Sequence, residues 1–509
     1  AGPARDLLEK RGIGLTLWRD PSGRTALELA DAQQQQGFKV WRSFDEPGGI
    51  RDELYQLAKD HPDIAKIEVI GTSRQDREII ALRLTKNVAT TPEGARPAVL
   101  YSSLQHAREW IGLEVNRRLL RHLVDNYGKD PAVTRLVDTR DFWFVPVANP
   151  DGYQMTFQEG RRLWRKTAWD INGDGAIGNG EGIDPNRNFA ERWNYDIEGS
   201  SGNPTSDTYR GTGPASEPET QAMQNLLIRG KDKGWKFTFQ VNYHSVAGLL
   251  LYGVGWQVQT RTPDDPILVA MSGIPERPAI PRSLPQLSAS LYITNGETCD
   301  FAYAQAGTLC WTPELSDQDS GGGFVFPDDE ALVQKEFDEN LPFAIDVAES
   351  ATDPSHPVSH LGNTVAPFYL DPFPVSYGDP QTVQVNAARH LGPVTMRYRI
   401  GEGAEQAAAT REWEGGERFG VTGDVYYRFV RGAVTGARPG DRVTVWFTAG
   451  DARSDAFTYT VAADSGAPVL VVAAEDYTGS APIYAKTDGP TYLQAYLDAL
   501  RANEIAADV

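Results

Sequence analysis

The feature of this sequence that most constrains its fold is a change in hydrophobic pattern part-way along the chain. Between residues 45 and 350, short apolar segments alternate with longer stretches whose apolar residues recur every three or four positions. From about residue 380, short segments with alternating apolar residues follow one another with only turns between them. The first pattern is typical of a sheet covered by helices, and the second of stacked antiparallel sheets. A chain of 509 residues is also too long for one ordinary core.

The first region predicts an α/β fold with a mixed open sheet that is flanked by helices on both faces. A helix is expected over residues 109–126, where Trp110, Leu113 and Leu120 follow a helical period. Another helix is expected around Ile50. The expected strands cover residues 64–70, 78–84, 98–102, 142–147 and 237–243, the first two as a hairpin.

Composition divides the rest of the chain. Residues 1–44 are polar and are expected to be an N-terminal extension or linker ahead of the α/β region over residues 45–350. Residues 351–379 are rich in Pro, Ser and His, which predicts a second linker. A β-sandwich of immunoglobulin or fibronectin type III size is expected over residues 380–464. Residues 465–509 predict the start of a further α/β unit that is truncated after its helix, so we expect residues of a third domain to be missing.

Charge and composition exclude some classes of partner. The net charge of −20 argues against a nucleic acid or an anionic membrane surface as partner. No apolar run has the length of a membrane span, and no signal peptide is present. The chain begins at Ala1 without a methionine, as a processed form or a fragment does. The two cysteines do not fix the redox compartment, and the oligomeric state stays open.

Two of the seven histidines directly follow predicted strands and are candidate metal ligands. His106 precedes Glu109 by three positions at a strand-to-helix junction, and His244 ends a later strand. Two histidines and one glutamate are a known set of catalytic zinc ligands, which leaves one position for water. On its own, the spacing of His106 and Glu109 also fits a packed histidine beside a helix cap.

Further segments follow in a fixed order and change that judgement. Over residues 45–350 the chain resembles the zinc metallocarboxypeptidases of the A, B and T type. Two histidines and one glutamate are the zinc ligands described for that family. The matching segments are His106-Ala107-Arg108-Glu109-Trp110, Asn149-Pro150-Asp151-Gly152-Tyr153, Trp164-Arg165-Lys166, Asp184-Pro185-Asn186-Arg187-Asn188, Tyr243-His244-Ser245, Leu291-Tyr292 and Thr312-Pro313-Glu314-Leu315.

The resemblance implies one catalytic zinc ion held by His106, Glu109 and His244. It gives Glu314 the role of general base and then acid, and Arg165 that of stabilising the tetrahedral oxyanion. The two histidines and Glu314 come just after predicted strands. Because ligands of open α/β sheets bind outside the carboxyl ends of the strands, we expect these side chains to converge at one edge.

The resemblance also implies how a peptide or protein substrate with a free C-terminus would be held. Arg187 would pair with the terminal carboxylate in a bidentate way, and Asn186 would add a hydrogen bond. Tyr292 would close over the substrate, and Arg108 would bind the residue upstream of the scissile bond.

Cys299 occupies the position that lies at the base of the side-chain pocket in the family. A small, weakly polar thiol there favours neutral or apolar C-terminal residues. Asp317 or Asp319 could still reach the pocket and favour basic ones. Whether Cys299 pairs with Cys310 is left open by the sequence.

A second metal-binding motif lies inside the α/β region. Residues 170–181 fit the twelve-residue calcium loop of the EF-hand, with Gly175 at the sixth place. No flanking helices are evident, so the alternative is an acidic turn without an ion, and we favour calcium because every ligand position is filled. The candidate calcium ligands are Asp170, Asn172, Asp174, Ala176 through its backbone oxygen, and Glu181.

Taken together, the motifs predict a secreted or extracytoplasmic zinc-dependent metallocarboxypeptidase, the location being implied by the resemblance alone. One alternative keeps the fold and the zinc but acts on cell-wall peptides that contain D-residues or diaminopimelate. Another is a non-catalytic binding module, against which the intact Glu314, Arg165 and three ligands weigh.

Overall fold

The computed structural model describes residues 19–20, 22–258, 260–315, 324–413, 426–463, 465–473 and 489–509. Its largest element is an eight-stranded sheet in the order β1-β2-β4-β3-β5-β10-β6-β9. The hairpin of β1 and β2 is antiparallel as predicted, whereas β4, β3, β5 and β10 run parallel to one another. The strands are β1 Ala65–Thr72, β2 Glu78–Leu84, β3 Ala98–Ser103, β4 Asp141–Val145, β5 Phe237–Ser245, β6 Leu249–Tyr252, β9 Leu284–Leu287 and β10 Leu309–Leu315.

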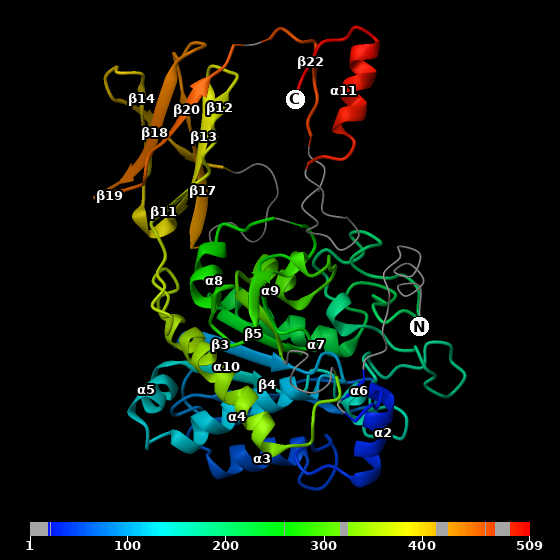
Figure 1. The fold of residues 1–509 in the computed structure, drawn as a ribbon. Helices are drawn as coiled ribbons and strands as arrows, with labels where there is room; N and C mark the ends of the chain where they lie inside the picture. Colours follow the sequence, from blue (N-terminus) through cyan, green and yellow to red (C-terminus); the bar gives the residue numbers. More distant parts are fainter. Residues whose placement is uncertain are drawn as a thin grey trace.

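Helices cover both faces of this sheet, which confirms the predicted α/β architecture (Figure 1). β3 and β5 are buried along their whole length, because a strand covered on both faces needs a continuous apolar run. Among the described helices, none combines the length and the apolar character of a membrane span. One face carries α3 (Ile50–Asp60), α4 (Trp110–Asn126), α5 (Pro131–Thr139), α8 (Asp265–Ser272) and α10 (Glu330–Ser350), and the other carries α7 (Pro218–Leu227) and α9 (Thr298–Ala306).

The expected N-terminal extension contains a helix, α2 (Ala26–Gln36). The Thr25 hydroxyl and the Glu28 carboxylate cap its first turn reciprocally. Farther along, Trp41 and Phe44 are each 1% exposed and belong to the main apolar core. The division of the chain near residues 45, 351, 380 and 465 stays a prediction.

The predicted β-sandwich consists of two sheets that share an apolar core (Figure 1). Its core residues alternate along the strands, as in Val383 and Val385 or Val443 and Val445, all fully buried. One sheet contains β11 (Phe368–Leu370), β13 (Gln381–Ala388), β17 (Tyr427–Val434) and β16 (Arg411–Glu412). The other contains β12 (Val375–Ser376), β20 (Phe457–Val461), β18 (Arg442–Ala449), β14 (Thr395–Ile400) and β15 (Gln406–Ala409), with β19 (Ala452–Arg453) paired to β18.

The last described segments form a small α/β unit, as predicted. β21 (Val469–Leu470) and β22 (Ala507–Asp508) pair in parallel, and α11 (Leu493–Ala502) lies between them in the chain. No residue of α11 is buried.

An ion pair between β2 and β4 lies inside the main sheet. Arg83 is 4% exposed and Asp141 fully buried, and the guanidinium makes two bonds of 2.8 Å to the carboxylate. Burial raises the pKa of Asp141 even with the arginine beside it. The carboxylate therefore depends on its partner for stability in the charged form.

Replacing this arginine is expected to destabilise the fold strongly. Arg83→Ala leaves a buried carboxylate without its cation, and the free energy of unfolding in urea should fall by about 3–5 kcal/mol. A second change, Asp141→Asn, should recover part of that loss. As a control, Arg51→Ala removes an exposed pair with Glu78 and should cost below about 1 kcal/mol. Equal effects of the two arginine variants would contradict the prediction.

Candidate metal and active site

Three of the predicted ligands meet where neighbouring parallel strands end. His106 follows β3, Glu109 precedes α4 and His244 lies near the end of β5. Their potential ligand atoms all lie within 4.8 Å of one another, and no other group of three acidic, histidine or cysteine side chains in the described ranges is gathered this tightly. The structure thus brings together residues that are more than 130 positions apart.

The geometry of these three side chains fits a tetrahedral metal ion. The Nδ1 atoms of His106 and His244 are 3.1 Å apart, and each lies 2.9 Å from a carboxylate oxygen of Glu109. Ligand atoms at about 2.0–2.1 Å from one tetrahedral zinc ion are separated by roughly 3.3 Å. With Nδ1 as the ligand, the other nitrogen of His244 can donate to Gln105 Oε1, which lies 3.2 Å away.

Electrostatics favours the cation-binding forms of His106 and Glu109, whereas for His244 burial would lower the pKa but the neighbouring Glu109 raises it. Burial, with Arg165 nearby, lowers the pKa of His106 and keeps the imidazole neutral. Burial alone would raise the pKa of Glu109, but the two histidines and their hydrogen bonds bring it below its usual value. Zinc binds neutral imidazole and ionised carboxylate, so the protonation states of His106 and Glu109 suit the ion.

Asp184 belongs to one of the matching motifs, but the resemblance implied no role for it. In the structure it lies between His106 and Arg165. Its Oδ1 atom is 3.0 Å from Nε2 of His106, and its Oδ2 accepts from Nε and Nη2 of Arg165 at 3.2 and 2.8 Å. Burial would raise the pKa of Asp184, yet Arg165 and His106 hold it well below the usual range. A carboxylate bonded to the far nitrogen of a ligating histidine orients the ring and increases its basicity.

Glu314 lies beside the ligands, on β10 directly opposite His244 in the sheet register. The side chain is half-buried. Burial and the neighbouring Glu109 carboxylate raise the pKa of Glu314 to about 7, whereas a bound dication would favour its charged form. The prediction that these side chains converge at the strand ends is therefore confirmed for His106, His244 and Glu314.

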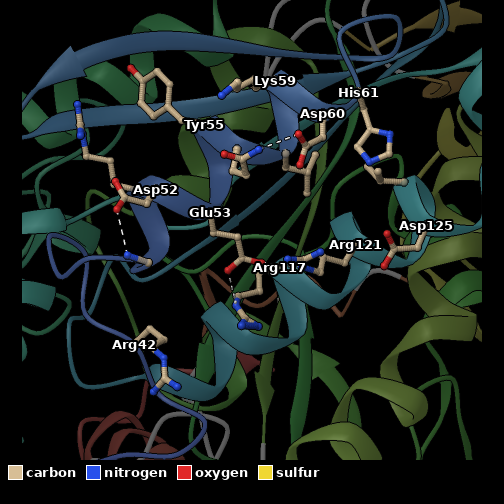
Figure 2. Close-up of a pocket in the computed structure, with 15 residues that line it drawn as sticks. Arg42, Asp52, Glu53, Tyr55, Lys59, Asp60, His61, Arg117, Arg121 and Asp125 are labelled. Atoms are coloured by element: carbon tan, nitrogen blue, oxygen red, sulfur yellow. Dashed lines mark hydrogen bonds and ion pairs between the residues drawn. The ribbon is translucent and has the colours of Figure 1, made fainter.

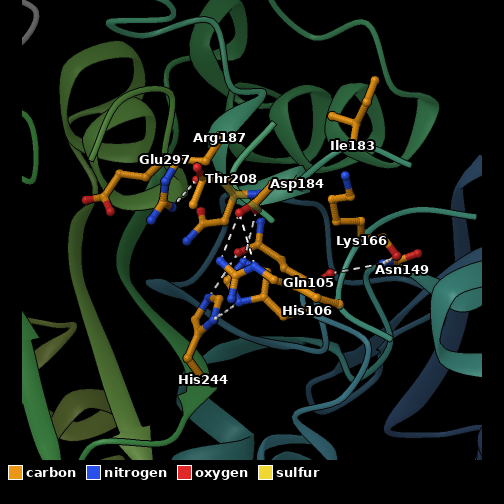
Figure 3. Close-up of polar contacts among 12 residues, drawn as sticks. Gln105, His106, Asn149, Lys166, Ile183, Asp184, Arg187, Thr208, His244 and Glu297 are labelled. Atoms are coloured by element: carbon orange, nitrogen blue, oxygen red, sulfur yellow. Dashed lines mark hydrogen bonds and ion pairs between the residues drawn. The ribbon is translucent and has the colours of Figure 1, made fainter. Parts of the chain in front are cut away.

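Of the predicted substrate-binding residues, Figure 3 labels Arg187, which lies on the opposite side of Asp184 from Lys166. Arg187 is 2% exposed, and its Nη1 atom donates to the carbonyl oxygen of Asn186. No carboxylate of the described chain lies within 4 Å of this guanidinium, which is unusual for a buried charge. Tyr292 is 41% exposed, with its ring centre 5.8 Å from the Arg187 guanidinium carbon.

Asn186 is held from the other side by α9. Its side-chain oxygen accepts from the backbone nitrogen and the hydroxyl of Thr298, both at 2.9 Å. Arg108 packs its guanidinium 3.9 Å from the centre of the Phe324 ring and lies 3.8 Å from Asp207. The structure therefore brings both of these predicted substrate ligands to the site.

The pairing of the two cysteines is settled by the structure, in which Cys299 and Cys310 form a disulfide. The side chain at the expected pocket base is thus a neutral disulfide and not a free thiol. Cys299 also lies 3.4 Å from the hydroxyl of Thr312, two residues before Glu314. Asp317 and Asp319 fall outside the described residues. Glu297, 6% exposed, brings a carboxylate to the same segment as Cys299.

The candidate calcium loop is described throughout, and its side-chain oxygens accept from the backbone nitrogens of the loop. Asp170 accepts from Gly173 and Gly175, and Glu181 from Asn172 and Gly178. The end of the loop is tied to the active site. The Lys166 ammonium donates to the carbonyl oxygens of Gly180, Pro204 and Ser206 at 2.6–2.9 Å.

Gly182, just past this loop, shows why the connection needs a glycine. Its φ is +84°, and an added Cβ would lie 1.9 Å from the carbonyl oxygen of Thr167. That close approach lets the backbone nitrogen of Thr167 donate to the carbonyl oxygen of Ile183, while the Thr167 hydroxyl accepts from the backbone nitrogen of Ile183. The segment that carries Arg165 thereby runs beside the one that leads to Asp184.

A groove of about 870 Å³ lies elsewhere, between α3 and α4 (Figure 2). Its arginines are largely neutralised, because Glu53 pairs with Arg117 at 3.2 Å and with Arg121 at 2.7 Å. None of the predicted site residues lines this groove.

Carboxypeptidases of other organisms are similar to this part of the chain. Mouse carboxypeptidase A4 is 30% identical over 346 residues, which cover 64% of this chain and 76% of that protein. Metallocarboxypeptidase A of Trichophyton rubrum is 28% identical, with 64% and 74% covered. Mouse carboxypeptidase A2 is 30% identical, and the match covers 64% of its length, slightly less than two thirds.

Solved structures and a family model agree with these relatives. Carboxypeptidase A from Helicoverpa armigera has a TM-score of 0.56 at 24% identity, with 68% of this chain and 85% of that one covered. Thrombin-activatable fibrinolysis inhibitor has a TM-score of 0.53 at 24% identity, with 64% and 80% covered, and at this identity both show the fold. The model of the zinc carboxypeptidase family matches residues 50–340, more than half of the chain. The protein therefore belongs to the zinc carboxypeptidase family.

Proposed function

We propose that this protein is a zinc-dependent metallocarboxypeptidase, which hydrolyses the C-terminal peptide bond of peptides and proteins. The observation that carries this proposal is Arg187, a buried guanidinium with no described carboxylate within 4 Å, in the same site as the three candidate metal ligands. A buried cation with no carboxylate in direct contact is suited to a substrate anion. A free terminal carboxylate is the anion that an exopeptidase must recognise.

Within this proposal, His106, Glu109 and His244 hold the ion. When bound, zinc polarises a carbonyl group and lowers the pKa of water towards about 7. Glu314 takes the proton of the attacking water and delivers it to the leaving amine, for which its place beside His244 is suited. Arg165 stabilises negative charge that develops on the carbonyl oxygen, and Asp184 fixes its guanidinium.

Substrate binding in this proposal uses groups on the Arg187 side. Arg187 pairs with the terminal carboxylate, and the amide of Asn186 donates a further hydrogen bond. Tyr292, exposed and near Arg187, covers the bound residue. Arg108 contacts the residue upstream of the scissile bond.

The preference for a C-terminal side chain rests on the Cys299 segment. The disulfide is neutral and favours neutral or apolar residues, whereas the Glu297 carboxylate nearby in the chain would favour basic ones. We propose the neutral or apolar preference. Substrates that differ only in the C-terminal residue, with Lys and Arg among them, separate the two.

A location outside the cytoplasm is also proposed. The disulfide of Cys299 and Cys310 supports it, because stable disulfides are rare in reducing compartments and common in secreted proteins. The acidic net charge agrees with a soluble enzyme that acts on peptides and not on nucleic acid.

We further propose that the loop of residues 170–181 binds a structural calcium ion. Its candidate ligands are hard oxygen atoms, which suit calcium better than zinc. The Lys166 ammonium donates to the backbone of Gly180 in this loop, and Lys166 is next to Arg165 in the chain. An ordered loop would therefore help to fix the position of Arg165. The ion would stabilise this arrangement and take no part in the chemistry.

The first test concerns Glu314. Glu314→Gln keeps the shape of the side chain but removes the base, so kcat should fall by about three to five orders of magnitude while the zinc content stays the same. Glu276→Gln changes an exposed glutamate and is the matched control. A Glu314→Gln variant within about tenfold of the parent would give this residue another role.

The second test compares a peptide with its C-terminal amide. The amide removes the charge that Arg187 would bind, and kcat/KM should fall by about thirtyfold to several thousandfold, as for a broken buried charge pair. Arg187→Ala should reduce cleavage of the free acid and leave little difference between acid and amide. Equal cleavage of both by the parent would indicate an endopeptidase, and a muropeptide cleaved in preference to either would support the cell-wall alternative.

The third test concerns calcium. At a hundredfold excess over Kd a bound ion adds about 2.7 kcal/mol of stability, so the parent should melt several degrees higher in millimolar calcium than in a calcium-selective chelator. Asp174→Ala should abolish that difference without loss of zinc. If the parent melts at one temperature in both solutions, the loop is an acidic turn.

A further inference from the structure

The junction between the β-sandwich and the main α/β part is built around one fully buried carboxylate, Asp264. Its Oδ1 atom accepts from the backbone nitrogens of Tyr426 and Tyr427, both at 2.8 Å, where β17 begins. Its Oδ2 atom accepts from the hydroxyl of Tyr303 on α9 at 3.1 Å. A single side chain therefore joins the sandwich to a helix of the α/β part.

Other contacts make this junction a packed interface. Asn386 of β13 donates from Nδ2 to the carbonyl oxygen of Pro263 at 2.7 Å. Tyr427 and Ala388, both on sandwich strands, are at most 1% exposed and belong to the apolar core that includes the main sheet. Since a shared core cannot open without exposing apolar surface, the two parts are expected to move as one.

The loop that precedes Asp264 is fastened to α9 at two points. Near its start, the backbone nitrogen of Gly255 donates to the Asp300 carboxylate at 3.0 Å. At its end, Asp264 accepts from Tyr303. Asp300 and Tyr303 are three positions apart and share one face of the helix. Loop and helix are thus held together along the first two turns of α9.

The first turn of α9 reaches the proposed active site. Thr298 donates from its backbone nitrogen and its hydroxyl to Asn186, each at 2.9 Å. The same hydroxyl accepts from Nε2 of Gln105 at 2.6 Å. A displacement of α9 would therefore move the Asn186 amide, which lies next to Arg187 in the chain.

We propose that the β-sandwich is a positioning element of the peptidase, which acts through Asp264 on α9 and so on the Asn186 side chain that binds the substrate's terminal carboxylate. The inference rests on the proposed function for the role of Asn186. It assigns Asp264 and Tyr303 as positioning residues, since neither contacts the metal ligands or the substrate anchors directly.

Three variants of the full chain test this role. Asp264→Ala removes all three bonds, whereas Asp264→Asn keeps an oxygen for both backbone nitrogens and can meet the Tyr303 hydroxyl with its amide. Burial raises the pKa of Asp264 to about 7, which indicates that this position tolerates a neutral side chain. Tyr303→Phe removes one bond only. Asp371→Ala, an exposed change beside the same junction, is the control.

For Asp264→Ala we expect KM for a free-acid peptide to rise tenfold or more, with kcat within threefold of the parent and unchanged zinc content. Asp264→Asn should restore the parent KM, and Tyr303→Phe should fall between. In hydrogen exchange, backbone amides of residues 298–306 and 253–258 should exchange faster in Asp264→Ala than in Asp264→Asn. A purely structural role predicts lower melting temperature with KM unchanged.

An unchanged KM in folded Asp264→Ala, or an Asn variant as impaired as the Ala variant, would overturn the proposal. If Asp264→Ala does not fold, Tyr303→Phe decides in the same way. Failure of the proposed function itself looks different, because the parent would then cleave acid and amide equally. Hydrogen exchange at α9 would still test the coupling between Asp264 and this helix. Equal exchange in Asp264→Ala and the parent would overturn that coupling.

Discussion

The buried carboxylate of Asp184 is the interaction on which the site depends most. It bonds on one side to the far nitrogen of His106 and on the other to the Arg165 guanidinium, and its own backbone nitrogen is held by Tyr209. A fully buried charge has to be matched by partners with good geometry, so each contact constrains the others. A ligand ring and a cation are thereby fixed relative to one another before any substrate arrives.

Two carboxylates of the site are driven to opposite protonation behaviour by their surroundings. Glu109 lies between two imidazoles and ionises more readily than a free glutamate, while Glu314 faces it and ionises less readily. Charge repulsion between the two contributes to that separation. One group is thus suited to remain an ionised ligand, and the other to accept and release a proton.

The parts beyond the main sheet differ in how firmly they belong to it. The β-sandwich contributes Tyr427 and Ala388 to the main apolar core, and its edge bonds to Asp264. The unit of β21, α11 and β22 has no buried residue in its helix. Apolar burial is the main source of cohesion between packed elements, so the β-sandwich behaves as one body with the main sheet. The unit of β21, α11 and β22 has no such cohesion through the described residues of its helix.

The sequence by itself determined the elements and the chemistry. Strand and helix periods predicted the α/β sheet and the sandwich, because a period depends on neighbours a few positions apart. Ordered motifs identified His106, Glu109, His244 and Glu314, because the side-chain types that hold and use a metal are few.

Only the tertiary structure decided which distant groups support those residues. Three examples depend on how strands and loops align in space. They are the Cys299–Cys310 disulfide, the bond of Asp184 to His106 and the hydrogen bonds of Asp264. The short strands β12 and β16 also give no local signal, since two residues cannot show a period. Contacts between residues far apart in the chain follow from sheet register and packing, and neither can be read from a local sequence pattern.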